Sequence, residues 1–149
     1  MSLATTCGHT GYRRRVEHDA EQTAQLNTAM PFGATLGLEL VAADADEVRA
    51  RLAWEERLCT AGGILHGGAL MSLADAAGAY LAFLNLPDAA GGTATIESKT
   101  NFFRAVREGH VNARSRLLHR GRTTIVVETD LFDDAEKHVA RVMQTQAVL

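Results

Sequence analysis

The stretch that most constrains the fold is residues 64–86, because Asp75 is its only formally charged residue. A run of about 20 apolar and small residues is typical of a membrane-spanning helix, or of a helix buried on all sides in a globular domain. An acid in the middle of a bilayer is costly, and His66 and three glycines also interrupt the run. We therefore predict a central helix over residues 66–85, buried inside a folded domain and stopped by Pro87.

The segments on both sides of this helix show the period-two alternation of half-buried strands. Apolar and charged residues alternate cleanly in residues 47–54. In the segment "TATIESKTNFFR", strict alternation puts Thr95 and Ser98 on opposite faces. The predicted strands span residues 36–44, 47–54, 93–104, 110–119, 122–133 and 137–149.

The fold class follows from how these elements can bury their apolar faces. Short connections between consecutive strands favour antiparallel pairing. The sheet must cover one face with something, and the predicted helix is the only long apolar candidate. Its many alanines and glycines would let a curved sheet approach closely. We therefore predict an α+β fold in which one antiparallel sheet wraps around one long central helix.

Length and composition fit one domain and exclude several classes of function. The chain has 149 residues, and we expect a single domain over residues 31–149 after an N-terminal extension, residues 1–30, with a possible helix over residues 16–30 that Pro31 ends. The net charge of −3 argues against nucleic acid and membrane partners. Cys7 and Cys59 form no disulfide framework, and the N-terminus lacks a secretory signal, which favours a cytoplasmic localisation. The six histidines lack metal-ligand spacing, so we expect no metal site and no cofactor.

Asp75 raises the question of chemistry. An acid in an apolar helix must be hydrogen-bonded, paired, solvated or protonated. One interpretation is structural, with Asp75 bonded to Ser72 or lying at a seam open to solvent. The other is a general base or nucleophile in a cleft.

The start of the helix favours the second interpretation. Four glycines flank His66, and backbone N–H groups there, with the helix dipole, would polarise a carbonyl oxygen as it becomes an oxyanion. Asp75 follows His66 by nine residues, which is about 13 Å along a helix. The substrate would therefore lie along the helix, or some groups of the site would come from another subunit.

Three segments together carry a family resemblance. They are "GGILHGGALMSLADAAG", "TATIESKTNFFRAVREG" and "LLHRGRTTIVVETDLFDDAEKHVARVMQTQAVL". The specific part is His-Gly-Gly with an acid nine residues after the histidine, followed by a threonine-led strand that ends in Asn-Phe-x-Arg. From residue 31 to the C-terminus, the sequence resembles the hotdog-fold acyl-CoA thioesterases of the phenylacetic-acid-pathway type.

This resemblance implies an activity and a catalytic set. The expected reaction is hydrolysis of an aryl, medium-chain or long-chain acyl-CoA to the free acid and coenzyme A. Asp75 would act as nucleophile or general base, and the N–H of Gly67 would polarise the thioester carbonyl. His66 would lie near the leaving group, and Thr95, supplied by the partner subunit, would hold the water. The resemblance also implies a homodimer with a continuous sheet, usually paired into a homotetramer, with active sites at the subunit interface.

Four further residues are candidates for substrate binding. Thr60 stands where the family often has an asparagine, and it can still form a hydrogen bond, although it is shorter. Gly68 shares the glycine-rich helix start. Arg120 and Arg122 could meet the phosphates of coenzyme A, although such arginines are also typical of a solvated face.

Two other classes of function remain open from the sequence. A hotdog hydratase or dehydratase would act on the same acyl thioesters, usually with a different motif that pairs a histidine with an acid. A non-catalytic acyl-CoA-binding module would bind the thioester without cleaving it, and Thr60 in place of asparagine is the feature that favours it.

Overall fold

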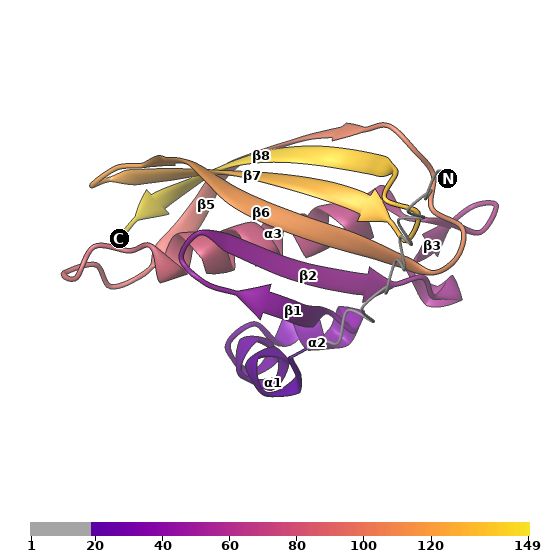
Figure 1. Cartoon of the computed structure of the whole chain (residues 1–149), viewed down its shortest axis with the longest axis horizontal. Helices are drawn as coiled ribbons and strands as arrows, with labels where there is room; N and C mark the ends of the chain where they lie inside the picture. Colours follow the sequence, from indigo (N-terminus) through magenta and orange to yellow (C-terminus); the bar gives the residue numbers. More distant parts are fainter. Residues whose placement is uncertain (1–18) are drawn as a thin grey trace, which may run out of the picture.

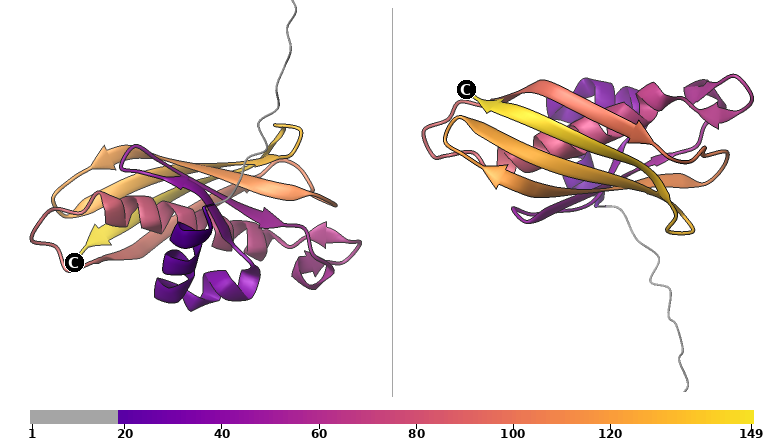
Figure 2. Two further views of the ribbon diagram at one scale, coloured as in Figure 1. Left: turned by 60° about the horizontal axis from the view of Figure 1, so that its bottom comes forward. Right: turned by 90° about the horizontal axis from the view of Figure 1, so that it is seen from above.

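A computed structural model describes residues 19–149, so Cys7 and the first three residues of the possible leading helix lie outside the described part. A curved antiparallel sheet of six strands wraps around one long helix, α3 (Figures 1 and 2). The sheet order is β1-β2-β6-β7-β8-β5. The predicted α+β architecture is therefore confirmed. The strands of the sheet are β1 (Glu39–Ala43), β2 (Glu47–Ala53), β5 (Thr93–Phe102), β6 (His110–Arg120), β7 (Thr124–Asp133) and β8 (His138–Val148).

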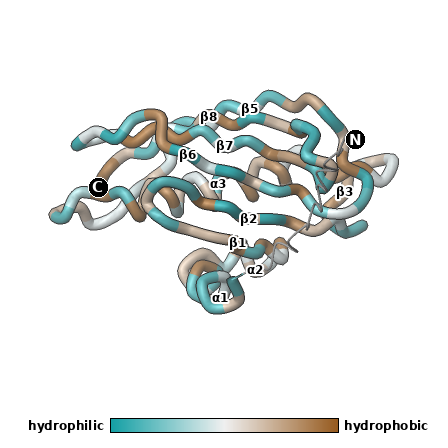
Figure 3. Tube along the Cα trace, viewed as in Figure 1, coloured by the Kyte–Doolittle hydropathy of each residue, from teal (hydrophilic) through white to brown (hydrophobic). Residues whose placement is uncertain are grey.

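The central helix α3 (Gly67–Leu84) is the core of the molecule. His66 and Asn85 are its N-cap and C-cap, so the predicted extent of the helix is confirmed. The side chains of Leu73, Ala77 and Leu81 are fully buried against the sheet. By length and composition alone α3 could cross a membrane, but here a sheet of the same chain covers its apolar face. Hydrophobic and hydrophilic stretches alternate along the strands (Figure 3).

The helix and the sheet approach each other closely at Gly78. A Cβ built there would overlap Oε1 of Gln144, whose side chain is 1% exposed. Gln144 cannot simply swing away, because its amide nitrogen is held by Asp75 and Thr95. Small residues on α3 therefore do what the sequence predicted, and let the sheet close tightly over the helix.

Gly78→Ala tests this contact. We expect the variant to lose about 1–3 kcal/mol in the free energy of unfolding, because the added methyl group overpacks a filled interior. Chemical denaturation of the variant and the wild type measures the difference. Ala79→Gly, on the adjacent and partly exposed position, is the control for helix propensity alone. A Gly78→Ala protein as stable as the wild type would contradict the close packing.

Strand β5 departs from strict alternation because of a β-bulge. Thr95 pairs with Gln146 and Glu97 pairs with Thr145, so Ile96 is an extra residue between them. The bulge puts Thr95 on the helix-facing side together with Ser98, and the prediction that these two residues face opposite sides is wrong. By contrast, β2 alternates regularly, and Val48, Ala50 and Leu52 are buried as predicted. This strand was predictable because it contains no bulge.

The segment before β1 folds differently from the prediction. Helix α1 (Ala20–Ala29) ends before Pro31, as expected, but Pro31 also starts a second short helix, α2 (Pro31–Leu36). Proline suits the first helical position because its missing N–H is not needed there. Gly37, with φ of 79°, ends α2, so the first strand begins at Glu39 rather than at residue 36.

Helix α1 is packed onto the sheet and contributes to the domain. The backbone N–H of Asp19 bonds to the carbonyl of Leu40, and the N–H of Leu40 donates to Oγ1 of Thr23 at 2.8 Å. Leu26 is buried in the core. The expected N-terminal extension therefore joins the folded domain from Asp19 onward.

The outer face of the sheet carries paired charges, and Asp130 is the most informative of them. Burial raises the pKa of Asp130, but the hydrogen bonds and charge of Arg141, with the charge of His138, outweigh burial and hold it below the usual value of 3.8. Arg141 donates from both Nε and Nη2 to this carboxylate at 2.8 Å. The ion pair therefore favours the deprotonated acid in the folded protein.

Acidification should remove this contribution. Because the folded-state pKa is lower than the unfolded one, Asp130 stabilises the fold above its unfolded pKa, and the stabilisation is lost as the pH falls through the folded pKa. We expect Asp130→Asn to be less stable than the wild type near neutral pH, and the gap to shrink below roughly pH 4. Thermal melts at several pH values measure it, with Asp88→Asn, an exposed loop acid, as the control. A gap that does not change with pH would contradict the assignment.

Candidate active site

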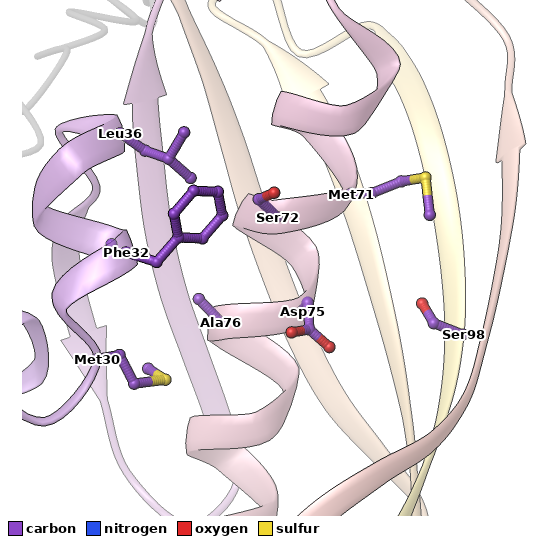
Figure 4. Close-up of a pocket in the computed structure, with 9 residues that line it drawn as sticks. Met30, Phe32, Leu36, Met71, Ser72, Asp75, Ala76 and Ser98 are labelled. Carbon is purple, nitrogen blue, oxygen red and sulfur yellow. The ribbon is translucent and has the colours of Figure 1, made fainter.

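Asp75 lies at the rim of a groove rather than in a sealed core. It is exposed within the single chain, halfway along α3. The groove has a volume of about 380 Å³ and crosses α3 between α2 and β5 (Figure 4). Its other lining residues are mostly apolar or small: Met30, Phe32, Gly33, Leu36, Met71, Ser72, Ala76 and Ser98. Ser72 and Ala76 face α2, whereas Met71 and Asp75 lie on the side of α3 toward Ser98.

One oxygen of Asp75 is hydrogen-bonded. The hydroxyl of Thr95 donates to Oδ1 at 3.1 Å, and Nε2 of Gln144 donates to the same oxygen. Ser72 takes no part, because its hydroxyl donates to the carbonyl of Gly68 at 2.8 Å. The structural interpretation in which Ser72 bonds the acid is therefore not what the chain adopts. Among the described residues, Oδ2 has no hydrogen-bond partner.

Thr95 reaches Asp75 within one chain, so the expectation that a partner subunit supplies it is corrected. The reason is the bulge in β5, which turns the Thr95 side chain toward α3. The sequence could not show this, because period-two alternation through residue 96 sends Thr95 to the other face.

His66 caps the start of α3 with its own side chain. Its Nδ1 accepts the N–H of Gly68 at 2.8 Å, so the ring nitrogen that carries the proton in the neutral form is Nε2. The N–H of Gly68 is therefore already used in the cap, and a contact of Gly68 with substrate stays a prediction. A Cβ on Gly68 would lie 2.9 Å from Nδ1 of His66, so glycine makes room for the imidazole.

The N–H of Gly67 is the amide left open at this helix end. The first helical N–H groups have no partner within the helix, and no described residue accepts this one. The ring of Phe102 packs against Gly67, where an added Cβ would lie 3.1 Å from Cζ. No acid stands in the first turn of α3, so the positive end of the helix dipole is not neutralised by the helix itself.

The remaining predicted residues lie away from Asp75. Thr60 is exposed on the short hairpin of β3 (Cys59–Thr60) and β4 (Ile64–Leu65), which follows a single 3-10 turn (Glu56–Leu58). Arg122 is exposed in the turn between β6 and β7, and its contact with coenzyme A stays a prediction. Neither residue belongs to the lining of the groove.

Arg120 has a structural partner for one nitrogen of its guanidinium group. Its Nε donates to the carbonyl of Asn85, the C-cap of α3, at 2.9 Å. A cation at this position satisfies a free helix carbonyl and complements the negative end of the dipole. The structure thus gives Arg120 a role at the helix end, and its contact with the phosphates of coenzyme A stays a prediction.

Arg120→Met tests this contact at the helix end. We expect it to lower the free energy of unfolding by about 1 kcal/mol, because one charge-assisted hydrogen bond at a helix end is lost. Arg122→Met, on the same turn, should leave stability within about 0.5 kcal/mol of the wild type. Paired denaturation curves measure both. Equal stability of the two variants would contradict the capping role.

Two polar residues and one apolar wall of this site were missed from the sequence. Gln144 and Gln146 lie on β8 and are 1% and 0% exposed. The detectable feature is the pair of glutamines in "QTQ", which lie on the face of β8 that otherwise buries valine and alanine, since buried polar side chains need partners. The apolar wall from α2, Phe32 and Leu36, was missed because the second helix was not foreseen.

Comparisons with known proteins agree on one family. A family model described as the thioesterase superfamily matches residues 62–140. The Mycobacterium tuberculosis protein named "Putative esterase Rv1847" is 30% identical over 123 residues, which cover 81% of this chain and 88% of that protein.

Solved structures of related proteins have the same fold as this chain. A mutant of the thioesterase PA1618 from Pseudomonas aeruginosa is 30% identical, with a TM-score of 0.80, over 88% of this chain and 96% of that one. A phenylacetic acid degradation-related protein from Ralstonia eutropha JMP134, titled "putative thioesterase", is 28% identical, with a TM-score of 0.73, over 80% of this chain and 90% of that one.

Proposed function

The chain belongs to the thioesterase superfamily and has its hotdog fold, and we propose that it hydrolyses acyl-CoA thioesters to free acids and coenzyme A in the cytoplasm. The observation that carries this proposal is the position of Asp75. Its carboxylate lies at the rim of an apolar groove, with Oδ1 hydrogen-bonded and Oδ2 without a partner among the described residues. A carboxylate held in this way can take a proton from water or attack a carbonyl carbon.

The reaction needs a base and an oxyanion site. In the general-base form, Oδ2 of Asp75 takes a proton from water while the water oxygen adds to the thioester carbonyl carbon. The N–H of Gly67 donates to the oxyanion of the tetrahedral intermediate. The C–S bond then breaks, and the sulfur leaves with the proton from Asp75 as the free thiol. In the nucleophilic form, Asp75 itself adds to the carbonyl carbon, coenzyme A leaves, and water cleaves the resulting anhydride.

The walls of the groove support an apolar acyl group as the substrate. Met30, Phe32 and Leu36 lie on one side of the groove, and Met71 lies next to Asp75 (Figure 4). None of the groove's other residues carries a charge. An aryl or an extended aliphatic acyl group would bury apolar surface here, whereas a charged acyl group would lose its hydration without an ion-pair partner.

A homodimer is part of the proposal. Gly67 and Asp75 are eight residues apart on one helix, about 12 Å along its axis, so they cannot both contact one carbonyl. Strand β5 is an edge of the sheet, and Ile96 on it is 63% exposed. Pairing of β5 with its two-fold copy would continue the sheet and bring Gly67 of the partner subunit toward Asp75. A tetramer made of two such dimers stays a prediction.

A thiol-release assay on a panel of acyl-CoAs tests the proposal. We expect hydrolysis of phenylacetyl-, benzoyl-, octanoyl- or palmitoyl-CoA, and much weaker hydrolysis of the charged succinyl-CoA. Enoyl-CoA hydration measured in parallel identifies a hydratase, and tight binding without thiol release identifies a binding module. Either of these results, without hydrolysis of any acyl-CoA in the panel, would overturn the proposal.

A further inference from the structure

Two buried glutamines on β8 have no place in the reaction as described, yet they contact its central acid. Gln144 and Gln146 lie on the helix-facing side of the strand and are almost inaccessible to solvent. Gln144 contacts Asp75 directly, and Gln146 contacts Thr95, which bonds Asp75. Buried amides are costly unless they are hydrogen-bonded, so the arrangement calls for an account of each proton.

The direction of these hydrogen bonds can be assigned from the Asp75 end, because a carboxylate only accepts. The hydroxyl of Thr95 therefore donates its one proton to Oδ1 of Asp75, and its oxygen can only accept from Gln146. The amide nitrogen of Gln146 thus donates to Oγ1 of Thr95 at 2.7 Å, and Oε1 of Gln146 accepts the hydroxyl proton of Thr93 at 3.0 Å. Nε2 of Gln144 also donates to Oγ1 of Thr95, at 3.1 Å.

These contacts use the whole hydroxyl of Thr95. Its single proton goes to Oδ1 of Asp75, at 3.1 Å, and its oxygen accepts two N–H groups. The second amide proton of Gln144 goes to the same Oδ1. Oδ1 thus accepts two hydrogen bonds, and Oδ2 accepts none from the described residues. The two oxygens of this carboxylate are therefore not equivalent.

We propose that Gln146, Thr95 and Gln144 are positioning residues that hold Asp75 through Oδ1 and make Oδ2 its reactive oxygen. This rests on the proposed thioesterase function. The proposal gives Thr95 a role other than holding the attacking water, because the proton and the lone pairs of its hydroxyl are all used in hydrogen bonds to Asp75, Gln144 and Gln146. Gln146 acts only through Thr95, and so its effect on turnover depends on the Thr95 hydroxyl.

Steady-state kinetics on the best acyl-CoA tests whether Gln146 acts on Asp75 through Thr95. We expect Thr95→Val and Gln146→Met each to lower kcat by about tenfold with KM within about twofold, since a misplaced base slows chemistry more than binding. The double variant should be no slower than Thr95→Val alone, and Thr95→Ser should keep wild-type kcat. Thr100→Val is the matched control, because Thr100 lies on the same strand with a buried hydroxyl that has no partner among the described residues.

Two results would overturn the positioning role of Gln146 and Thr95 while leaving the proposed thioesterase function intact. One is wild-type kcat in Gln146→Met, which is the outcome if Thr95 simply holds water. The other is a double variant whose losses multiply. If Gln146→Met fails to fold, Thr93→Val is the substitute, because it removes the hydrogen bond from Thr93 on the edge strand to Gln146. This variant should also lower kcat. Failure of the thioesterase function itself would be visible earlier, as a wild type that releases no thiol.

Discussion

Asp75→Asn is expected to lower kcat for the best acyl-CoA by about 10²–10⁴-fold, the range attributable to a positioned base. The amide has the shape of the carboxylate and can still accept the hydrogen bonds of Thr95 and Gln144 through its oxygen. It cannot take a proton from water or form an anhydride. The fold should therefore survive while the chemistry is lost, with KM changed little. Thiol release under saturating substrate measures the effect.

Ser72→Ala is the control for this substitution. Ser72 lines the same groove one turn before Asp75, but its hydroxyl bonds only to the carbonyl of Gly68. We expect near wild-type kcat, and thermal melts of both variants close to that of the wild type. An Asp75→Asn protein that is folded and keeps more than about a tenth of wild-type turnover would remove Asp75 from the mechanism.

Gly67→Pro is expected to lower kcat by about 10²–10³-fold, because it deletes one oxyanion donor. Proline should fit this position. His66 has φ of −63° and ψ of 136°, the extended conformation preferred before proline, and the first helical residue tolerates a missing N–H. Gly67→Ala is the control, since it presents a similar Cβ to Phe102 and keeps the N–H. Equal activity of the two variants would mean that this amide contributes nothing.

Mixing two inactive variants tests whether Gly67 and Asp75 act across the dimer. After subunit exchange, a heterodimer of Gly67→Pro and Asp75→Asn would contain one intact site and one doubly altered site. An equal mixture should recover about a quarter of wild-type activity, because half of the dimers are mixed and half of their sites are intact. No recovery, despite exchange shown by mass spectrometry of the dimers, would place both groups in one chain or exclude the pairing.

The sequence predicted those parts of the fold where one periodicity decides the outcome. The central helix and the alternation in β2 follow from apolar spacing, and the antiparallel pairing follows from the short connections between strands. The face of Thr95 was not predictable in this way, because one extra residue in β5 shifts the alternation and no residue type marks that site. Likewise, α1 ends just before Pro31 and α2 begins at it, whereas a proline in the sequence indicates only that a helix boundary lies nearby.

The candidate site was predictable for its isolated features and not for its contacts. An acid without neighbouring charges pointed to Asp75, and glycines at a helix start pointed to Gly67. Which N–H stays open depended on the rotamer of His66, which uses the amide of Gly68. The role of Arg120 depended on a carbonyl 35 residues away in sequence, and such a pairing arises only from the tertiary fold.

The N-terminal cap of α3 bears on the balance between stability and activity in this protein. Helix α1 has an aspartate cap and an acid in its first turn, which together offset the positive end of its dipole. Helix α3, the core of the molecule, has a histidine cap and no acid there. The central helix thus lacks the stabilisation that an acidic cap would add, and in the proposed reaction the positive potential of its N-terminal end would act on the transient negative charge of the oxyanion. Substitutions that improve this cap with an acid would be expected to yield a more stable and slower protein, a trade-off of the kind met where a site must stay electrostatically unsatisfied at rest.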